Sequence, residues 1–507
     1  MNYKKATIWV IIISSALRII IANTIYLGVD EVYYRQFANT LQINYLDHPP
    51  MVAWLIRLTT INLQYNTDVA IRLGAILCAA AATWVVYCCG KLLHSHKAGY
   101  YAAILYSTNL YTSIIAGTFI LPDSPQVLFY TLGLYLALHI VSTKQITIPK
   151  VMWLYAFSTM VGLAFMCKIH AVFLWFGFLL YCILYNRHWC KHKVFYFSIL
   201  LSCAFAIPLL YWNIQHNFIT FTYHSSRVNV LNSPINFTTF FQFNIGQIAY
   251  SNIIFLGLFI IAIRAYYQQK VIINKLHYKL LICCILPIIV VASIISLFKQ
   301  VLPHWTGQAF IPMMLLTAVW LAQLPNISTK ALLPNSIKLA ILLYVLIISI
   351  SLVGIKYLPT TLGKKNNANR GSNDFTADLI GWSGMKNQMQ KVTTRVNDST
   401  AILICNGWFP AAHVEHYIAE PLHMPIIALG SIDKIHQYYW WNNKVNYTNK
   451  PINAFIVKPS NYTYAINEFA FLQNKLPTSI DTLYNIRNNY LVNYFVIYYY
   501  KNVVIAK

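Results

Sequence analysis

Residues 28–50 read GVDEVYYRQFANTLQINYLDHPP, and the interpretation of the whole chain starts from this stretch. It follows the first apolar segment and holds three of the five acidic residues that precede residue 357, namely Asp30, Glu31 and Asp47. Carboxylates beside lipid are expensive, and they usually serve a function there. Their grouping with tyrosines next to an apolar segment therefore predicts a reaction site at a membrane edge.

The composition is that of a membrane protein. The 507 residues are 58% hydrophobic and 10% charged, whereas soluble proteins have about 25% charged residues. The apolar runs are long and uninterrupted, which indicates membrane-spanning helices. The net charge of +24 does not indicate nucleic-acid binding, because the basic residues are spread between apolar spans instead of gathering on one face.

The apolar runs predict eleven transmembrane helices, most of them near the length of about 20 residues that a bilayer requires. The first is expected to be a retained helix and not a cleaved signal peptide, because no small-residue cleavage site follows it. The predicted spans are 7–27, 69–90, 98–116, 124–142, 151–167, 170–186, 194–212, 244–265, 280–298, 306–324 and 338–356.

The charges between the spans predict an orientation. Alternate breaks hold fifteen basic residues on one side and five on the other. The positive-inside rule places the first set, and with it the N-terminus, in the cytoplasm. All five acidic residues before residue 357 then lie on the opposite side, and an odd number of spans places the C-terminal part there as well.

The composition changes at residue 356 and predicts two domains. Residues 1–356 form the membrane module, with long outer loops at 28–68 and 213–243, and residues 357–507 hold eight of the thirteen acidic residues. Amphipathic patterns in the first outer loop predict interfacial helices at 32–41 and 51–63. The tail is predicted to be a small α/β domain, with helices at 377–396 and 408–419 and strands at 400–405, 452–458 and 490–499.

Six short motifs occur in order along the chain: DEVYY (30–34), YLDHPP (45–50), LPDSP (121–125), GLAFMCKIH (162–170), LPHW (302–305) and DFTADLIGW (374–382). In this set the chain resembles the membrane-embedded GT-C glycosyltransferases, specifically the bacterial relatives of protein O-mannosyltransferases and of the lipid A aminoarabinose transferase. The resemblance implies a polytopic α-helical GT-C fold and a sugar donor carried on undecaprenyl phosphate.

The resemblance implies that Asp30 is the catalytic base, since a sugar hydroxyl becomes a good nucleophile only when its proton is accepted. The alternative is that Asp30 caps a helix beginning near Val32. Five further residues are expected in the substrate pocket, with helix capping, the aromatic belt or packing as the alternative for each; they are Glu31, Tyr34, Tyr45, Asp123 and His304.

Three residues are expected to bind the donor phosphate by the same resemblance, namely His48, Lys168 and Arg227. Arginine suits bidentate phosphate binding, whereas His48 stands where relatives carry lysine, and a neutral imidazole donates one hydrogen bond only. Asp47 and His224 are candidate ligands for a divalent metal ion. The alternatives are a proline-stabilised turn at Asp47 and a solvated loop histidine.

These expectations combine into an inverting glycosyltransferase of the bacterial inner membrane. It would move a sugar from a polyprenyl-phosphate donor to lipid A or another envelope acceptor on the periplasmic face. A protein O-mannosyltransferase is the alternative within the same class. A transporter or flippase of lipid-linked sugars is the alternative from another class, and it would place ionisable groups at mid-membrane instead of at the span ends. A non-catalytic envelope assembly factor would not need Asp30.

Overall fold

The computed structural model describes residues 2–143, 145–231, 233–325, 333–462, 469–472 and 475–505. The chain forms two compact units. Met1–Ala22 and Leu41–Ile348 make up the first, called the membrane unit below, and Asn23–Thr40 and Ser349–Lys507 make up the second, the C-terminal unit. Asp30 therefore belongs to the C-terminal unit, whereas the sequence had placed it in a loop of the membrane module.

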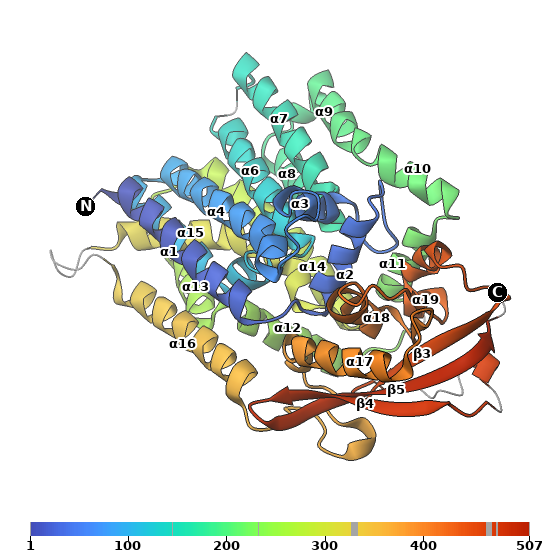
Figure 1. Cartoon of the computed structure of the whole chain (residues 1–507). Helices are drawn as coiled ribbons and strands as arrows, with labels where there is room; N and C mark the ends of the chain where they lie inside the picture. Colours follow the sequence, from blue (N-terminus) through green and yellow to red (C-terminus); the bar gives the residue numbers. More distant parts are fainter. Residues whose placement is uncertain are drawn as a thin grey trace. The chain divides into compact units, whose positions relative to one another are not determined.

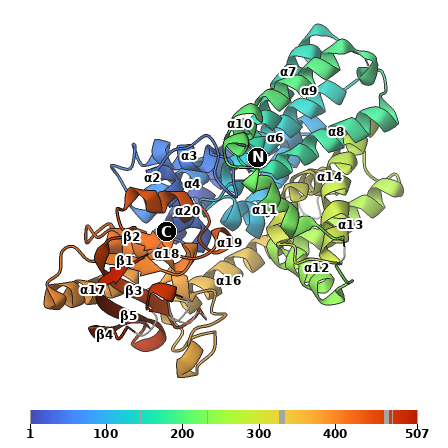
Figure 2. The same ribbon diagram turned by 90° about the vertical axis from the view of Figure 1, so that its right-hand side faces the viewer.

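The membrane unit is built from helices (Figure 1). Helix α4 packs on α5 and α6, α6 on α7, and α5 on the deeply buried α15; Figure 2 shows α7, α8 and α9 close together. The helices are α1 (Tyr3–Thr24), α3 (Met51–Thr59), α4 (Asp68–Leu93), α5 (His96–Thr108), α6 (Asp123–Val141), α7 (Ile148–Phe165), α8 (Val172–Tyr185), α9 (Lys193–Ala204), α10 (Ile207–Gln215), α11 (Ile219–Val228), α12 (Phe237–Ser251), α13 (Ile253–Tyr267), α14 (Lys275–Ser296), α15 (Phe310–Gln323) and α16 (Asn335–Tyr357).

Seven helices of the described chain are long and apolar enough to cross a membrane, or nine if each of two bent pairs counts as one span. The chain is thus a multi-pass membrane protein, with fewer full-length spans than the eleven predicted. The predicted spans 98–116 and 170–186 correspond to shorter helices, namely α5 and the apolar segment Ile169–Tyr185.

The predicted span 244–265 contains a bend that its hydropathy did not predict. Helices α12 and α13 lie at 95° to each other, although residues 244–265 were predicted as one span. Asn252 stands at the bend with a φ of 74°, and its side chain accepts a hydrogen bond from the Ile254 amide to begin α13. A capping asparagine thus divides the run into two helices.

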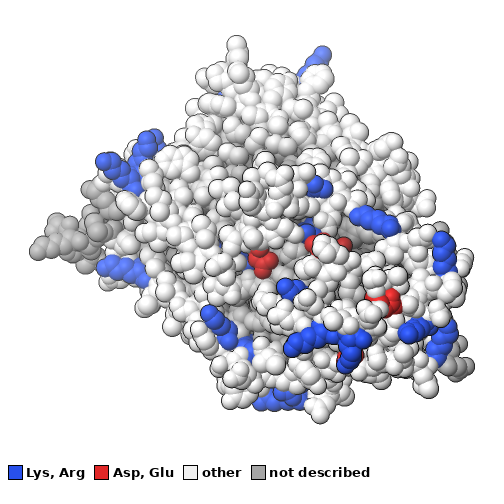
Figure 3. Space-filling model, viewed as in Figure 1, with Lys and Arg blue, Asp and Glu red and all other residues white. Residues whose placement is uncertain are grey.

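The surface of the membrane unit agrees with burial in lipid. The face shown in Figure 3 is nearly free of charged residues over α6, α7 and α9. Large apolar side chains are exposed on these helices, including Met152, Phe197 and Leu200. Exposed apolar residues of this density indicate contact with hydrocarbon and not with water.

The C-terminal unit contains a five-stranded mixed sheet in the order β2-β1-β3-β5-β4. Strand β1 pairs in parallel with β2 and β3, whereas β5 is antiparallel to both β3 and β4. The strands are β1 (Ile402–Cys405), β2 (Ile426–Ala428), β3 (Pro451–Pro459), β4 (Ser479–Arg487) and β5 (Tyr490–Val504). The three predicted strands are confirmed as β1, β3 and β5.

Helices cover this sheet and complete the α/β domain that the sequence predicted. Helix α17 (Trp382–Val396) packs on β4, and α18 (Trp408–Val414) packs on β1 and β2. The π-helical turn η7 (Glu415–Ala419) extends α18, so the predicted helix at 408–419 is confirmed in two parts. Helix α2 (Val29–Asn39) belongs to this unit and packs on α18.

Candidate active site

A buried ion pair lies at the centre of the membrane unit's polar site. Asp123 begins α6, and Lys168 follows the end of α7; the Lys168 Nζ lies 2.8 Å from Asp123 Oδ2. The other carboxylate oxygen, Oδ1, accepts a hydrogen bond of 2.9 Å from the Tyr111 hydroxyl. Gln126, one turn into α6, donates to the Lys168 carbonyl at 2.9 Å. The sequence placed Asp123 and Lys168 at one site, and the structure joins them directly.

Four half-buried histidines lie within electrostatic range of Lys168. Lys168 acts electrostatically on all of them, and Arg227 acts on two, His224 and His304. The histidines are His48, His170, His224 and His304. With Lys168 and Arg227 they form what is called the basic cluster below. Asp123 acts electrostatically on three of the histidines, His48, His170 and His304.

The two histidines that lie outside the spans are held neutral. Burial, and then the charge of Lys168, lower the pKa of His48 well below its ordinary value. Burial also lowers the pKa of His224, against the opposing effect of its hydrogen bond to Asp47 and with a further contribution from Arg227. Each neutral imidazole offers one donor and one acceptor. The permanent positive charge of the cluster therefore comes from Lys168 and Arg227.

The loop that carries His48 is fixed at both of its ends. The Tyr45 amide donates to the His48 carbonyl at 3.2 Å, which closes the turn, and the Met51 amide donates to the Met166 carbonyl at 3.3 Å. The second bond joins the YLDHPP and GLAFMCKIH motifs. The second outer loop reaches the same place through His224. The ring of His224 lies 6.4 Å from the ring of His48, centroid to centroid, in a T-shaped arrangement.

The predicted metal ligands do not converge on a metal site. The Nε2 atom of His224 donates to the main-chain carbonyl of Asp47 at 3.0 Å, instead of facing a shared ion with the carboxylate. Within the described ranges no group of three or more His, Cys, Asp or Glu side chains has the arrangement of a metal site. The metal role of Asp47 and His224 therefore stays a prediction.

The sequence missed two positioning residues. Tyr111, which holds Asp123, lies against Gly307 so closely that a Cβ atom at position 307 would stand 2.2 Å from the tyrosine Cζ. His170 packs on Trp305 with ring centroids 5.3 Å apart. His170 could have been found in the GLAFMCKIH motif, whereas Tyr111 had no signal among 37 tyrosines.

Three further residues predicted in the substrate pocket, Glu31, Tyr34 and Tyr45, make capping, packing or hydrogen-bond contacts within the fold. Glu31 is buried, and its Oε2 accepts from the Gly28 amide at 2.8 Å, which caps α2. Tyr34 packs on Phe37 at 5.4 Å between ring centroids. Tyr45 is fully buried and accepts a hydrogen bond from the Gln42 amide. The expected pocket roles of these three stay predictions.

Asp30 and Arg227 are the exposed members of the predicted set. Asp30 lies in the first turn of α2, in a different unit from the basic cluster, so its catalytic role stays a prediction. The guanidinium of Arg227 lies over the Tyr223 ring at 5.1 Å. An exposed guanidinium keeps its fork of donors available to an anion.

The DFTADLIGW motif organises the C-terminal unit. Asp374 accepts hydrogen bonds from the Thr361 hydroxyl at 2.7 Å and from the Leu362 amide at 2.8 Å. Trp382 is fully buried and donates to the Asp378 carbonyl at 2.8 Å. Burial, and secondarily Asp374, raise the pKa of Asp378 to about 7. This motif therefore joins the segment after α16 to the sheet domain.

Comparison with known proteins agrees with this architecture. Residues 47–212 match the dolichyl-phosphate-mannose-protein mannosyltransferase family; this segment holds Asp47, His48, Asp123, Lys168 and His170. The lipid A galacturonosyltransferase RgtD of Rhizobium johnstonii is 23% identical over 296 residues, which are 58% of this chain and 60% of the relative. The match thus covers less than two thirds of that relative's length.

Two solved structures share the fold over nearly the whole chain. ArnT from Cupriavidus metallidurans bound to undecaprenyl phosphate superposes with a TM-score of 0.62 at 13% identity, covering 96% of this chain and 97% of ArnT. Its apo state gives a TM-score of 0.61 at 12% identity, with the same coverage. Identities this low establish the fold. The chain thus has an ArnT-like fold, and its residues 47–212 match the mannosyltransferase family.

Proposed function

We propose that this protein is an inverting glycosyltransferase that moves a sugar from a polyprenyl-phosphate donor to lipid A or a related lipopolysaccharide acceptor. The observation that carries the proposal is the basic cluster: Lys168, Arg227 and four histidines, next to the carboxylate of Asp123. Lys168 is neutralised by Asp123, so the exposed Arg227 supplies the uncompensated charge, and neutral histidines supply directed hydrogen bonds. This combination suits a phosphate group.

The proposed reaction is a single displacement. An acceptor oxygen attacks the anomeric carbon, the bond from that carbon to the phosphate oxygen breaks, and polyprenyl phosphate leaves with the electron pair. The basic cluster stabilises the charge that develops on the leaving phosphate. If the acceptor is a hydroxyl, Asp30 accepts its proton. If the acceptor is a phosphate, it is already ionised, and Asp30 orients it instead.

The relatives support the choice of donor and acceptor. One structure with this fold holds undecaprenyl phosphate, and the relative from Rhizobium johnstonii acts on lipid A, as its name states. A protein acceptor is the second candidate, because residues 47–212 match a family of enzymes described as protein mannosyltransferases. We place the reaction at the periplasmic face of the inner membrane, on the charge distribution between the spans.

Mass spectrometry of lipid A and of envelope glycoproteins, from cells with and without the gene, tests the acceptor. A lipid A species that disappears with the gene and returns with a plasmid copy supports the proposal. Loss of a glycoprotein modification with unchanged lipid A identifies the second candidate. A periplasmic reporter fused after Lys356 tests the orientation, and an inactive fusion contradicts it.

Transfer by the purified protein before and after dialysis against EDTA tests the metal expectation for Asp47 and His224. From the placement of these two side chains, we expect activity to survive chelation. Loss of activity that added Mn²⁺ or Mg²⁺ restores would show that a metal site forms with substrate.

A further inference from the structure

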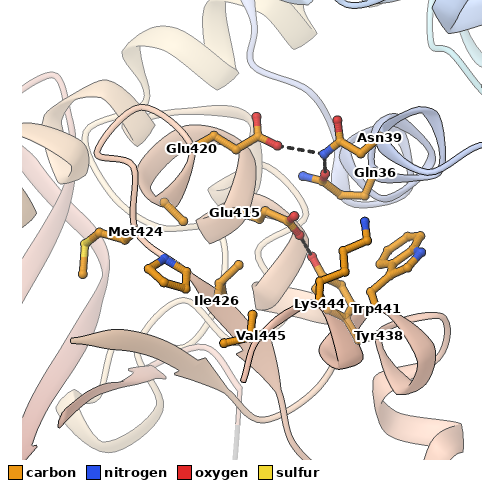
Figure 4. Close-up of a pocket in the computed structure, with 12 residues that line it drawn as sticks. Gln36, Asn39, Glu415, Glu420, Met424, Ile426, Tyr438, Trp441, Lys444 and Val445 are labelled. Atoms are coloured by element: carbon orange, nitrogen blue, oxygen red, sulfur yellow. Dashed lines mark hydrogen bonds between the residues drawn. The ribbon is translucent and has the colours of Figure 1, made fainter. Parts of the chain in front are cut away.

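A second polar site lies within the C-terminal unit (Figure 4). It is a cavity of about 200 Å³ formed by α2, η7 and the segment that follows β2. The lining residues with polar groups are Gln36, Asn39, Glu415, Glu420, Tyr438 and Lys444, and Trp441 adds an aromatic wall. Such a mixture of convergent polar groups and apolar wall is typical of small-molecule sites.

The polar groups of this cavity are held in place by hydrogen bonds. Asn39 donates to Glu420 Oε1 at 2.9 Å and to Gln36 Oε1 at 2.5 Å, and Glu420 also pairs with Arg35. On the other side, the Tyr438 hydroxyl donates to Glu415 Oε2. Figure 4 shows both groups, with the bonds of Asn39 drawn above the bond between Tyr438 and Glu415. A preorganised arrangement of this kind loses little entropy on binding a ligand.

The charges within the cavity nearly cancel. Burial raises the pKa of Glu415 to about 7, although the Tyr438 hydrogen bond opposes the shift. Burial also tends to raise the pKa of Glu420. The hydrogen bonds from His416 and Asn39 and the charge of Arg35 outweigh this effect, so the pKa of Glu420 is lowered. Lys444 is exposed and adds a positive charge beside these groups. A ligand therefore meets donors and acceptors without a strong net field.

The apolar part of the lining suits the carbon face of a ring. Trp441 and Tyr438 pack edge to face with centroids 5.1 Å apart, and Ile426 and Val445 complete the wall. Aromatic side chains present flat apolar surface, while carboxylates and amides bind hydroxyl groups. The volume is smaller than that of a drug-sized site, which spans about 300–1,000 Å³.

We propose that this cavity binds one uncharged sugar residue of a transfer substrate, through Glu415, Glu420 and Lys444 at its hydroxyls and Trp441 at its ring face. The identity of the substrate rests on the proposed function; the binding of a sugar does not. The sugar belongs either to the acceptor glycan or to the donor, and the same chemistry recognises both.

Saturation-transfer NMR on the full chain in nanodiscs tests the sugar. The probes are methyl glucoside, methyl galactoside and methyl mannoside as uncharged sugars, with glucosamine and glucuronate as charged ones. We expect at least one uncharged glycoside to bind, and both E415Q and K444A to weaken it at least fivefold. The control is K391A, which removes an exposed lysine on α17 that does not line the cavity. Because Lys444 is exposed, K444A keeps the test valid if E415Q fails to fold.

Three results of the binding experiment would overturn the proposal: no uncharged glycoside binds, binding is the same in both variants and in wild type, or a charged sugar binds more tightly. Transfer kinetics identify the source of the sugar. A KM raised for the acceptor alone assigns the cavity to the acceptor, a KM raised for the donor alone assigns it to the donor, and unchanged KM values for both contradict the proposal. If the wild type binds glycosides but transfers no sugar, the result contradicts the proposed function and still supports sugar binding in the cavity.

Discussion

The basic cluster and the cavity of the C-terminal unit each hold a buried carboxyl group, but the two groups have different partners. Asp123 is paired with the ammonium of Lys168 and with a tyrosine hydroxyl. Glu415 has a tyrosine hydroxyl, Tyr438, and its pKa is raised to about 7. An ion pair keeps a carboxylate charged, whereas burial beside a neutral donor favours protonation. The partner of each carboxyl group thus determines whether that group stays charged at neutral pH.

The comparison is tested most strongly by removing the cation of the first site. In K168M, Asp123 is left buried without its ammonium, which we expect to cost about 3–5 kcal/mol of stability and to abolish transfer. Thermal unfolding in nanodiscs and a transfer assay measure the two effects. The double variant D123N/K168M removes both charges, and we expect it to recover most of the stability but no activity. If K168M keeps wild-type stability, the buried ion pair is not as described.

Neighbouring acids on α2 separate chemistry from capping. We expect D30N to lower kcat by about 10²- to 10⁴-fold, the contribution of a general base, with little change in unfolding temperature. The matched change E31Q weakens the bond to the Gly28 amide, so it should cost about 0.5–1.5 kcal/mol of stability and leave most of the activity. Unchanged transfer by D30N at normal protein levels contradicts the catalytic role.

The packing behind Asp123 can be changed without touching a charge. G307A would place its Cβ against the Tyr111 ring, which we expect to cost about 1–3 kcal/mol and to weaken the hydrogen bond to Asp123. Y111F, which keeps the ring and removes the hydroxyl, is the companion variant. If both variants lower kcat while donor affinity stays normal, Tyr111 positions the carboxylate. If neither changes kcat, Tyr111 has a packing role only.

The raised pKa values of the C-terminal unit predict a pH dependence of its stability. Between about pH 4.5 and 7 the unfolded chain has lost the protons of Glu415 and Asp378, which the folded unit still holds. The free energy of unfolding should therefore fall as pH rises through this window, by about 1.4 kcal/mol per pH unit for each group. Tryptophan fluorescence in a denaturant series measures it. E415Q should remove about half of the slope, and an unchanged slope would refute the assignment.

The smallest expected effect concerns the exposed end of the basic cluster. R227A should weaken binding of polyprenyl phosphate about fivefold at low salt, the size of an exposed ion pair of about 1 kcal/mol. Because the charge is exposed, the difference should shrink at 0.5 M NaCl. Affinity measured with a fluorescent polyprenyl phosphate at the two salt concentrations tests this. R227K is the control, since it keeps the charge without the planar fork.

Particular elements show how far prediction from sequence reached. The helices at 32–41 and 51–63 were predicted within a few residues of α2 and α3, because their amphipathic periodicity is a local property. Strands β2 and β4 (Ser479–Arg487) were missed; the three residues of β2 are too short to show alternation. The bend at Asn252 was missed because its cause is one backbone torsion and one cap, neither of which alters hydropathy.

The sequence by itself determined that the chain is a multi-pass membrane protein, with its few acids grouped beside apolar spans and an α/β tail. Those properties follow from composition and from periods of a few residues. Only the tertiary structure decided that Asp123 pairs with Lys168, 45 residues away, and that Asp30 belongs with the C-terminal unit. Pairing of this kind depends on how distant helices pack, and packing has no counterpart in local sequence pattern.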